Sequence, residues 1–137
     1  MTDNKAIVRR FYDRLNALDA EGILSLLSDD VKWWLPTDQV GGMVQGKAQM
    51  AGLLPAMFGV FEPGAGPVMT IGRLVGEGGT VCAEVTGRGG RTRGGVNYEN
   101  DYHVLFEIAD GQIVELREFM NPLLVGPLAA EVAAQAG

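Results

Sequence analysis

The sequence predicts a single α+β domain in which three N-terminal helices pack on an antiparallel sheet. Three observations predict this fold. Apolar residues recur at helical spacing in the first half of the chain, side chains alternate as in strands in the second half, and the two kinds of segment do not alternate with each other. The length of 137 residues is that of one domain, so we expect one domain over residues 1–137.

The first half of the chain contains the three predicted helices. Residues 3–18 place Ile7, Phe11 and Leu15 on one stripe, which is the pattern of a helix with one buried face. The other two helices are predicted at residues 20–28 and Lys47–Val60. Between these two helices we expect a short strand, Val31–Leu35, followed by a loop, Thr37–Gly46.

The second half of the chain has the two-residue period of strands. The predicted strands are Val68–Glu77, Thr80–Arg88, Val96–Ala109 and Gln112–Met120. Hairpin turns are predicted at Gly78-Gly79 and Asp110-Gly111. The last stretch, Leu123–Ala136, is rich in alanine and is predicted to be a short helix that closes one end of the fold.

One segment between two strands, residues 87–95, is rich in arginine and glycine. It is shorter than the arginine–glycine tracts that bind RNA, and the rest of the chain is acidic. We therefore predict a flexible hairpin loop, whose arginines could still meet an anionic ligand at the mouth of a pocket.

The composition excludes several classes of function. A net charge of −6 gives no attraction to phosphate backbones or anionic lipid, so neither nucleic acid nor membrane is expected as a partner. One cysteine cannot form an internal disulfide and suits a reducing compartment, and one histidine beside it argues against a protein-held metal. The N-terminus has no apolar signal core, so we expect a cytoplasmic protein. We also expect neither a cofactor nor a metal.

Side-chain alternation on the last predicted strand puts Glu118 on the same face as Leu116 and Met120. If that face is the inner one, the carboxyl group is desolvated and its pKa rises toward neutrality, where it can give and take a proton. Glu118 is therefore the first catalytic candidate. The alternative is a salt bridge from Glu118 to an arginine on a neighbouring strand.

The preceding strand presents two different faces. Tyr98, Asn100 and Tyr102 share the face that can line a pocket, where Tyr102 is a catalytic candidate and Asn100 could bind a substrate oxygen; tyrosines in such sheets also simply pack. His103 lies on the opposite face with Asp101, and we expect it at the surface or in a subunit interface. Because helices can cover only one face of the sheet, a homodimer through the other face, with Glu99, Asp101, His103 and Leu105, is expected.

Trp33 and Trp34 precede Pro36, and whichever way their strand is turned, at least one of them faces inward. A pocket tryptophan suits a flat aromatic ligand, while core packing is the alternative. The complete set of expected substrate contacts is Trp33, Trp34, Leu35, Met57, Phe58, Tyr98, Asn100, Leu116 and Met120.

Several sequence motifs occur in the order of a known family. The pieces are IVRRFYDRLNALD, SDDVKWWLP, QGKAQM and DGQIVELREF. In this order they resemble the SnoaL-like polyketide cyclase branch of the nuclear transport factor two-like superfamily over nearly the whole chain. The resemblance implies a cystatin-like fold, in which the curved antiparallel sheet forms a cone-shaped roll around a conical pocket, and a dimer in most members. Members include isomerases, cyclases, epoxide hydrolases, dehydratases and non-catalytic binders, so the fold alone does not settle the function.

The resemblance also bears on single residues. Residues 98–100 and 117–122 are similar to the phenazine biosynthesis A/B proteins, in which the glutamate at the position of Glu118 is the acid catalyst. Glu84 loosely matches an aspartate of limonene epoxide hydrolases, although Cys82 stands where that family has an arginine. Glu84 is thus a third catalytic candidate that would share a proton with Glu118 if both faced the pocket; the alternative is a pair with Arg73 or Arg88.

Other family mechanisms are not matched. Ketosteroid isomerases need a tyrosine and an aspartate where this chain has Phe11 and Leu35, and the histidine that the phenazine A/B proteins use near the third helix is missing. The sequence thus leads to two hypotheses. The first is a cofactor-free lyase, cyclase, dehydratase or isomerase that acts by general acid–base catalysis on a small, apolar, oxygenated or aromatic substrate. The second is a non-catalytic binding or accessory protein with the same pocket.

Overall fold

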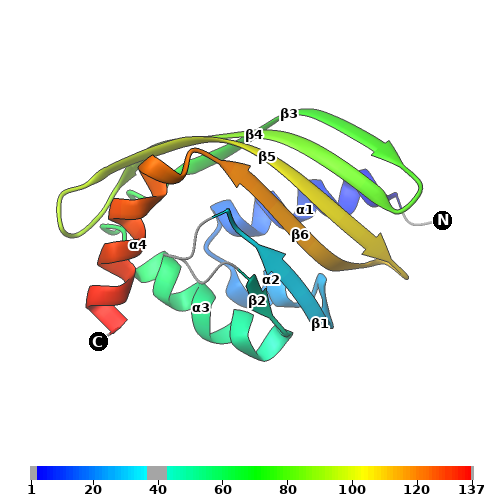
Figure 1. Cartoon of the computed structure of the whole chain (residues 1–137), viewed down its shortest axis with the longest axis horizontal. Helices are drawn as coiled ribbons and strands as arrows, with labels where there is room; N and C mark the ends of the chain where they lie inside the picture. The colour runs from blue at the N-terminus through cyan, green and yellow to red at the C-terminus, as the bar shows by residue number, and fades with distance from the viewer. Residues whose placement is uncertain (1–2, 37–42, 137) are drawn as a thin grey trace.

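The computed structural model describes residues 3–36 and 43–136. Its helices are α1 (Asn4–Asn16), α2 (Ala20–Leu24), α3 (Lys47–Gly59) and α4 (Pro122–Ala136). Its strands are β1 (Leu27–Trp34), β2 (Met43–Gln45), β3 (Val68–Glu77), β4 (Thr80–Arg91), β5 (Asn97–Ala109) and β6 (Gln112–Met120). The predicted α+β fold is confirmed: one curved six-stranded sheet arches over the helices (Figure 1).

The N-terminal helices begin where the sequence supplies caps. The carboxylate of Asp3 accepts the backbone N–H of Lys5 (3.0 Å), and that of Asp19 accepts the N–H of Gly22 (2.9 Å). Helix α2 is shorter than predicted and ends at Leu24, because Leu26 and Leu27 are both buried and the chain already enters β1 at Leu27. The prediction of a helix up to residue 28 was therefore wrong at its C-terminal end.

The strand order is β2-β1-β6-β5-β4-β3. All neighbours are antiparallel except β1 and β6, which run parallel, so the expectation of a purely antiparallel sheet was wrong at this pair. Strands β1 and β6 are separated by most of the chain, and no hairpin forces them to run in opposite directions. Residues 43–45 of the predicted loop 37–46 form β2, which pairs with β1, and Gly46 caps α3. Residues 37–42 lie outside the described residues.

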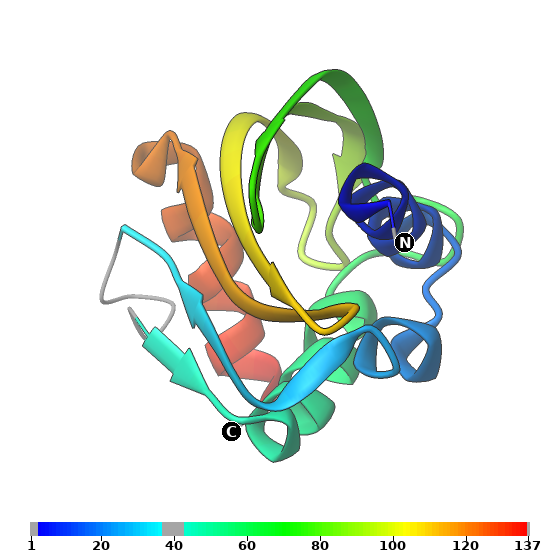
Figure 2. The same ribbon diagram turned by 90° about the vertical axis from the view of Figure 1, so that its right-hand side faces the viewer.

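Irregular pairing gives the sheet its curvature. The register shifts between β3 and β4, between β4 and β5, and between β5 and β6, and such bulges bend and twist strands. Viewed from one end, the sheet is strongly curved, with α1 and α2 on one side and α4 behind it (Figure 2). The concave side of this curved sheet is where a pocket can form.

The arginine–glycine segment is more regular than predicted. Strand β4 continues to Arg91, and the turn to β5 is closed by a hydrogen bond from the Thr92 N–H to the Val96 carbonyl (2.8 Å). Gly95 supplies the positive φ of 90° that this turn needs. Its arginines bind the protein itself, as in the pair of Arg88 with Asp101 (2.5 Å), and none of them lines the cavity described below.

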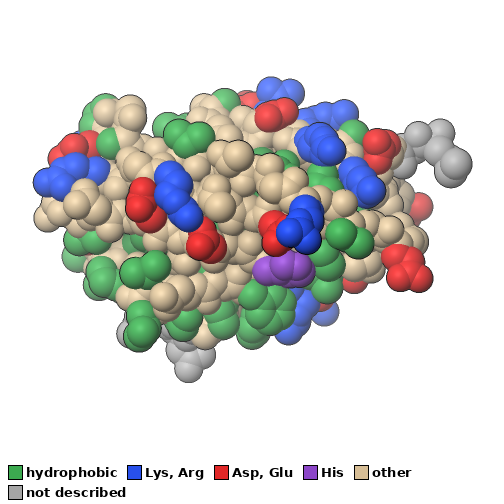
Figure 3. Space-filling model, turned by 90° about the horizontal axis from the view of Figure 1, so that it is seen from above, with side chains coloured by type: hydrophobic (Ala, Val, Ile, Leu, Met, Phe, Trp, Pro, Cys, Tyr) green, Lys and Arg blue, Asp and Glu red, His purple; other side chains and the backbone are tan. Residues whose placement is uncertain are grey.

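The two faces of the sheet differ in chemistry. The concave face carries the buried core with α1, where Phe11, Tyr12 and Phe106 pack edge to face. The convex face is a mixture of paired charges and scattered apolar side chains, and the chain's one histidine, His103, is exposed on it as expected (Figure 3). No helix among the described residues is long and apolar enough to span a membrane.

Candidate functional site

A cavity of about 350 Å³ lies on the concave side of the sheet, within the range of small-molecule sites. Helices α1, α3 and α4 and strands β1, β5 and β6 contribute to its wall. Most of the wall is apolar, with Leu15, Leu54, Met57, Phe58 and Met69 among its side chains. The arrangement suits a largely apolar ligand.

The polar side chains in this wall come from three adjacent strands. Trp33 stands on β1, Glu118 on β6, and the phenols Tyr98 and Tyr102 on β5. Glu118 is opposite Val104 in the register of β5 and β6, and Tyr102 is opposite Met120. Glu118 and Tyr102 are therefore diagonal neighbours on the same face, a relation that leaves about 7 Å between such residues.

Glu118 is the one carboxyl group among the described residues that line the cavity. Its side chain is half-buried. Because Glu118 lines the cavity, we attribute its exposed part to the cavity interior, and protein surrounds the rest of the side chain. Burial raises its pKa from 4.5 to about 7, and the indole N–H of Trp33 has a smaller effect that lowers this pKa. That N–H does not reach the geometry of a full hydrogen bond and has no hydrogen-bond partner among the described residues.

No arginine or lysine of the described residues forms an ion pair with Glu118. The alternative of a salt bridge to a neighbouring strand is therefore not realised in this part of the chain. A carboxyl group with a pKa near 7 and no cationic partner can exist in either protonation state near neutral pH. The side chain can thus both donate and accept a proton.

The hydroxyl groups of Tyr98 and Tyr102 are hydrogen-bonded to each other. Burial raises the pKa of both phenols, so both are protonated at neutral pH. A third phenol, Tyr12 on α1, is buried nearby, and its hydroxyl has no hydrogen-bond partner among the described residues. Burial is the main cause that raises the pKa of Tyr12, and the negative charge of Glu118 raises it further. The Tyr12 hydroxyl therefore lies close enough to the Glu118 carboxylate to interact with its charge.

The structure puts eight of the predicted site residues in the wall of the cavity: Trp33, Leu35, Met57, Phe58, Tyr98, Tyr102, Glu118 and Met120. Side-chain alternation accounts for the strand residues among them, whereas Met57 and Phe58 stand on α3. The roles assigned to them remain predictions.

Four predicted site residues lie elsewhere. Leu116 has no exposed surface and packs in the hydrophobic core, and it does not line the cavity. Trp34 faces the other side of β1, where it contacts Phe119 (ring centroids 5.1 Å apart) and lies under the Arg117 guanidinium. Because successive side chains of β1 point to opposite faces of the sheet, only one of the two tryptophans can line the cavity.

Glu84 is on the convex face of β4, because the buried residues of this strand are Val81, Ala83 and Val85. Its carboxylate pairs with Arg73 (3.1 Å), as the alternative reading proposed. The expectation that Glu84 and Glu118 face one pocket and share a proton was wrong.

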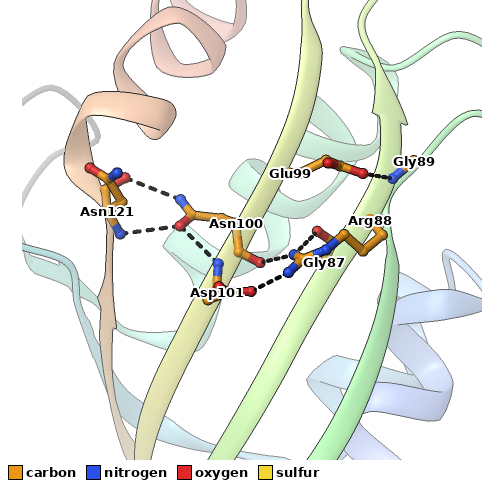
Figure 4. Close-up of polar contacts among 7 residues, drawn as sticks. All are labelled: Gly87, Arg88, Gly89, Glu99, Asn100, Asp101 and Asn121. Carbon is orange, nitrogen blue, oxygen red and sulfur yellow. Dashed lines mark hydrogen bonds and ion pairs between the residues drawn. The ribbon is translucent and has the colours of Figure 1, made fainter.

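Asn100 shares the inner face of β5 but does not line the cavity. It is buried, and its side-chain oxygen accepts the backbone N–H groups of Asp101 (3.0 Å) and Asn121 (3.1 Å), as Figure 4 shows. Its amide nitrogen donates to the Asn121 carbonyl (3.1 Å) and to the Tyr98 hydroxyl (3.3 Å). All of its hydrogen-bonding capacity is used inside the protein, so the expected contact with substrate was wrong.

The sequence reasoning missed the wall that α4 provides. Its lining residues are Val125, Leu128, Ala129, Val132 and Ala133. These positions follow the i, i+3, i+4, i+7, i+8 spacing of one helix face, so the signal was present in the sequence. Tyr12 was also missed, since nothing in the sequence distinguishes it from the neighbouring Phe11 as a residue close to the carboxyl group.

The residues of the site do not suggest a metal. Among residues 3–36 and 43–136, no three His, Cys, Asp or Glu side chains come together as metal ligands. The described lining also contains no lysine, arginine or histidine, so no cation faces the ligand.

A family model described as a SnoaL-like domain matches residues 8–116 of the chain. No curated protein matches the chain. Among solved structures, TerC co-crystallised with polyporic acid is similar, with a TM-score of 0.78 and 21% identity over 93% of this chain and 98% of the other.

Two further structures have no assigned function. An NTF2-like protein from Burkholderia pseudomallei K96243 has a TM-score of 0.81 and 18% identity over 94% of this chain and 98% of its own. A protein with a cystatin-like fold from Xanthomonas campestris has a TM-score of 0.80 and 22% identity over 93% and 98%. At these identities the likeness shows the fold, and it confirms the NTF2-like, cystatin-like architecture expected from the motifs.

Proposed function

Because this chain belongs to the SnoaL-like domain family, whose fold hosts different chemistries, we propose a function from its own cavity. We propose that it is a cofactor-free enzyme in which Glu118 acts as general acid and base on a small, largely apolar substrate that carries oxygen. The reaction would be of the lyase, cyclase, dehydratase or isomerase type. The observation that carries this proposal is the pKa of about 7 of a carboxyl group that lines an apolar cavity.

The chemistry follows from the two forms of Glu118. The protonated carboxyl can donate to a carbonyl oxygen or to a leaving hydroxyl group, and the carboxylate can remove a proton from carbon next to a carbonyl. In the apolar cavity little water competes for that proton. Tyr102, the diagonal neighbour of Glu118 on β5, is placed to bind the substrate oxygen while the proton moves.

The charge of the wall supports a neutral substrate. An anionic group would lose its hydration in the cavity and would find no lysine, arginine or histidine among the described lining residues. It would also be repelled by the Glu118 carboxylate above pH 7. The co-crystal of TerC with polyporic acid supports the use of this fold as a site for an organic compound, although it does not identify the ligand of this chain.

A second candidate function is binding without turnover. The observation that favours it is the position of Glu84 on the convex face, which leaves Glu118 as the one carboxyl group among the described lining residues. Reactions that need a separate acid and base would then have to use Glu118 twice or recruit a phenol. A ligand held by Tyr102 and the apolar wall, and released unchanged, fits the same cavity.

The test begins with ligands found by thermal shift from a panel of small ketones, lactones and aromatic compounds. Turnover of the compounds that bind is then compared between the parent protein, Glu118→Gln and Glu84→Gln. We expect Glu118→Gln to lower turnover by about 100-fold and Glu84→Gln to leave it unchanged. Binding that persists with no turnover in the parent protein would support the binding function instead.

A further inference from the structure

Asn100 has a side-chain orientation that the hydrogen bonds determine. Its Oδ1 faces the backbone N–H groups of Asp101 (3.0 Å) and Asn121 (3.1 Å), as Figure 4 shows. Backbone N–H groups only donate, so the side-chain atom that meets both of them is the oxygen. The amide nitrogen must then lie on the other branch of the side chain, without the ambiguity that asparagine often has.

The amide nitrogen of Asn100 carries two hydrogens, and each has a partner. One is donated to the carbonyl oxygen of Asn121 (3.1 Å), and the other to the hydroxyl oxygen of Tyr98 (3.3 Å). An amide N–H cannot accept a hydrogen bond. The Tyr98 hydroxyl is therefore an acceptor in its contact with Asn100.

The second contact of the Tyr98 hydroxyl is the hydroxyl of Tyr102. A hydroxyl that accepts one hydrogen bond becomes a stronger donor in the next, so hydrogen bonds in such chains tend to point the same way. We infer that the chain runs from Asn100 to Tyr98 to Tyr102, and that the hydroxyl hydrogen of Tyr102 is thereby kept for an oxygen atom of the ligand. Asn100 is then a positioning residue that never touches the ligand.

This direction specifies the ligand that the site selects. Tyr102 has no acceptor for its hydrogen other than Tyr98 among the described residues, and it is one of the residues that line the cavity. A carbonyl oxygen at the end of an apolar body would satisfy this hydrogen and would lie beside Glu118, the diagonal neighbour. A hydrocarbon of the same shape would leave the phenol hydrogen unpaired. The inference rests on the proposed function only in taking this cavity as the ligand site.

The test uses two probes that differ in one group, 2-acetonaphthone and 2-isopropenylnaphthalene, in which CH₂ replaces the carbonyl oxygen. Their dissociation constants are measured by calorimetry near pH 8.5 (about 1.5 units above the pKa of Glu118), where this carboxyl group is ionised and cannot donate. In the parent protein we expect the ketone to bind about tenfold more tightly, the usual value of one hydrogen bond. The carbonyl stretching band of the bound ketone should also move to lower frequency.

Two phenylalanine variants decide which phenol supplies the hydrogen. Tyr102→Phe should remove both the preference for the ketone and the shift of its carbonyl band, whereas Tyr98→Phe should keep most of both. If Tyr98→Phe removes the preference and Tyr102→Phe keeps it, the chain runs in the opposite direction and the inference is overturned.

The role of Asn100 is tested by reversing the chain. In Asn100→Asp the carboxylate accepts the Tyr98 hydrogen, Tyr98 accepts that of Tyr102, and the preference for the ketone should fall to about one. Adding Tyr98→Phe to Asn100→Asp should restore it, which a merely structural defect at residue 100 would not allow. Lack of rescue in a folded double variant would contradict the positioning role, and if the aspartate variants do not fold, the phenylalanine pair still decides the direction.

The parent protein separates this inference from the proposed function. Equal affinity for the two probes would overturn the inference while leaving the cavity as a ligand site. No binding of either probe would count against both.

Discussion

Glu131 on α4 accepts a hydrogen bond from the hydroxyl of Thr92, which lies in the turn between β4 and β5. The same carboxylate accepts the backbone N–H of Gly94 (3.2 Å), and the hydroxyl of Thr92 in turn accepts the N–H of Val96 (2.9 Å). Helix α4 forms one wall of the cavity, so these bonds connect that wall to the far end of the β4–β5 hairpin.

We predict that Glu131→Ala loosens the α4 wall. Losing hydrogen bonds to a charged group should cost about 2 kcal/mol of unfolding free energy, and hydrogen exchange should become faster in α4 before it does in the sheet. Gln135→Ala, on an exposed position of the same helix, is the control and should change neither.

Gly94→Ala tests the same contact from the other side. A Cβ at residue 94 would come within 2.7 Å of the Glu131 carboxylate, which must then move away. The two variants should accelerate exchange in the same peptides of α4. Unchanged exchange in both would show that apolar packing alone holds the helix.

The raised pKa of Glu118 predicts how stability depends on pH. The folded protein holds this proton more tightly than the unfolded chain, so the protonated carboxyl costs nothing at low pH. The cost of ionising it appears as pH rises from the unfolded pKa of about 4.5 through the folded pKa of about 7. At higher pH this cost reaches about 3 kcal/mol of unfolding free energy. Glu118→Gln should therefore become progressively more stable than the parent over this window.

The measurement is urea unfolding of parent, Glu118→Gln and Glu84→Gln between pH 4 and pH 8. Glu84 is exposed and paired with Arg73, so its variant should show no such rise with pH. A stability difference between Glu118→Gln and the parent that is constant across this window would mean that Glu118 is not desolvated.

Trp33, and not Trp34, should report ligand entry. Trp33 lines the cavity, whereas Trp34 packs on Phe119 at the other face of β1. The change in emission on adding 2-acetonaphthone should survive in Trp34→Phe and disappear in Trp33→Phe, with binding to each variant checked by calorimetry. A response that follows Trp34 would place the ligand outside this cavity.

We further propose that the convex sheet face, with Glu99, Asp101, His103 and Leu105, forms a homodimer. The support is that α1 packs on the concave face only, which leaves Leu105 half-buried and Phe119 44% exposed on the other. Sedimentation at micromolar concentration should show a dimer, and Leu105→Asp should dissociate it. The control is Leu123→Asp, at a position on α4 that is 83% exposed, and it should leave the dimer intact. A parent protein that sediments only as a monomer would contradict the proposal.

The two-residue alternation of the strands was enough to predict much of the site. It places Glu118 with Met120, and Tyr98 with Tyr102, on one face, because successive side chains in a strand must point to opposite sides. The family motifs then indicated which face is concave. Alternation could not decide between Trp33 and Trp34. The prediction for Glu84 relied on a family position, although Glu84 follows the buried Ala83 and its side chain therefore points to the other face of β4.

The sequence by itself determined the type of the longer helices and strands, the α+β class and which side chains of β5 and β6 share a face, since these depend on local periodicity and on the turns between neighbours. Only the tertiary structure decided that β1 runs parallel to β6 and that α4 forms a cavity wall. It also decided that the amide nitrogen of Asn100 donates its hydrogen bonds to Asn121 and Tyr98. These relations join residues far apart in the chain, or depend on the direction of single hydrogen bonds. The pKa of Glu118 belongs to the same class, because desolvation is set by everything that packs around the carboxyl group and not by its neighbours in the sequence.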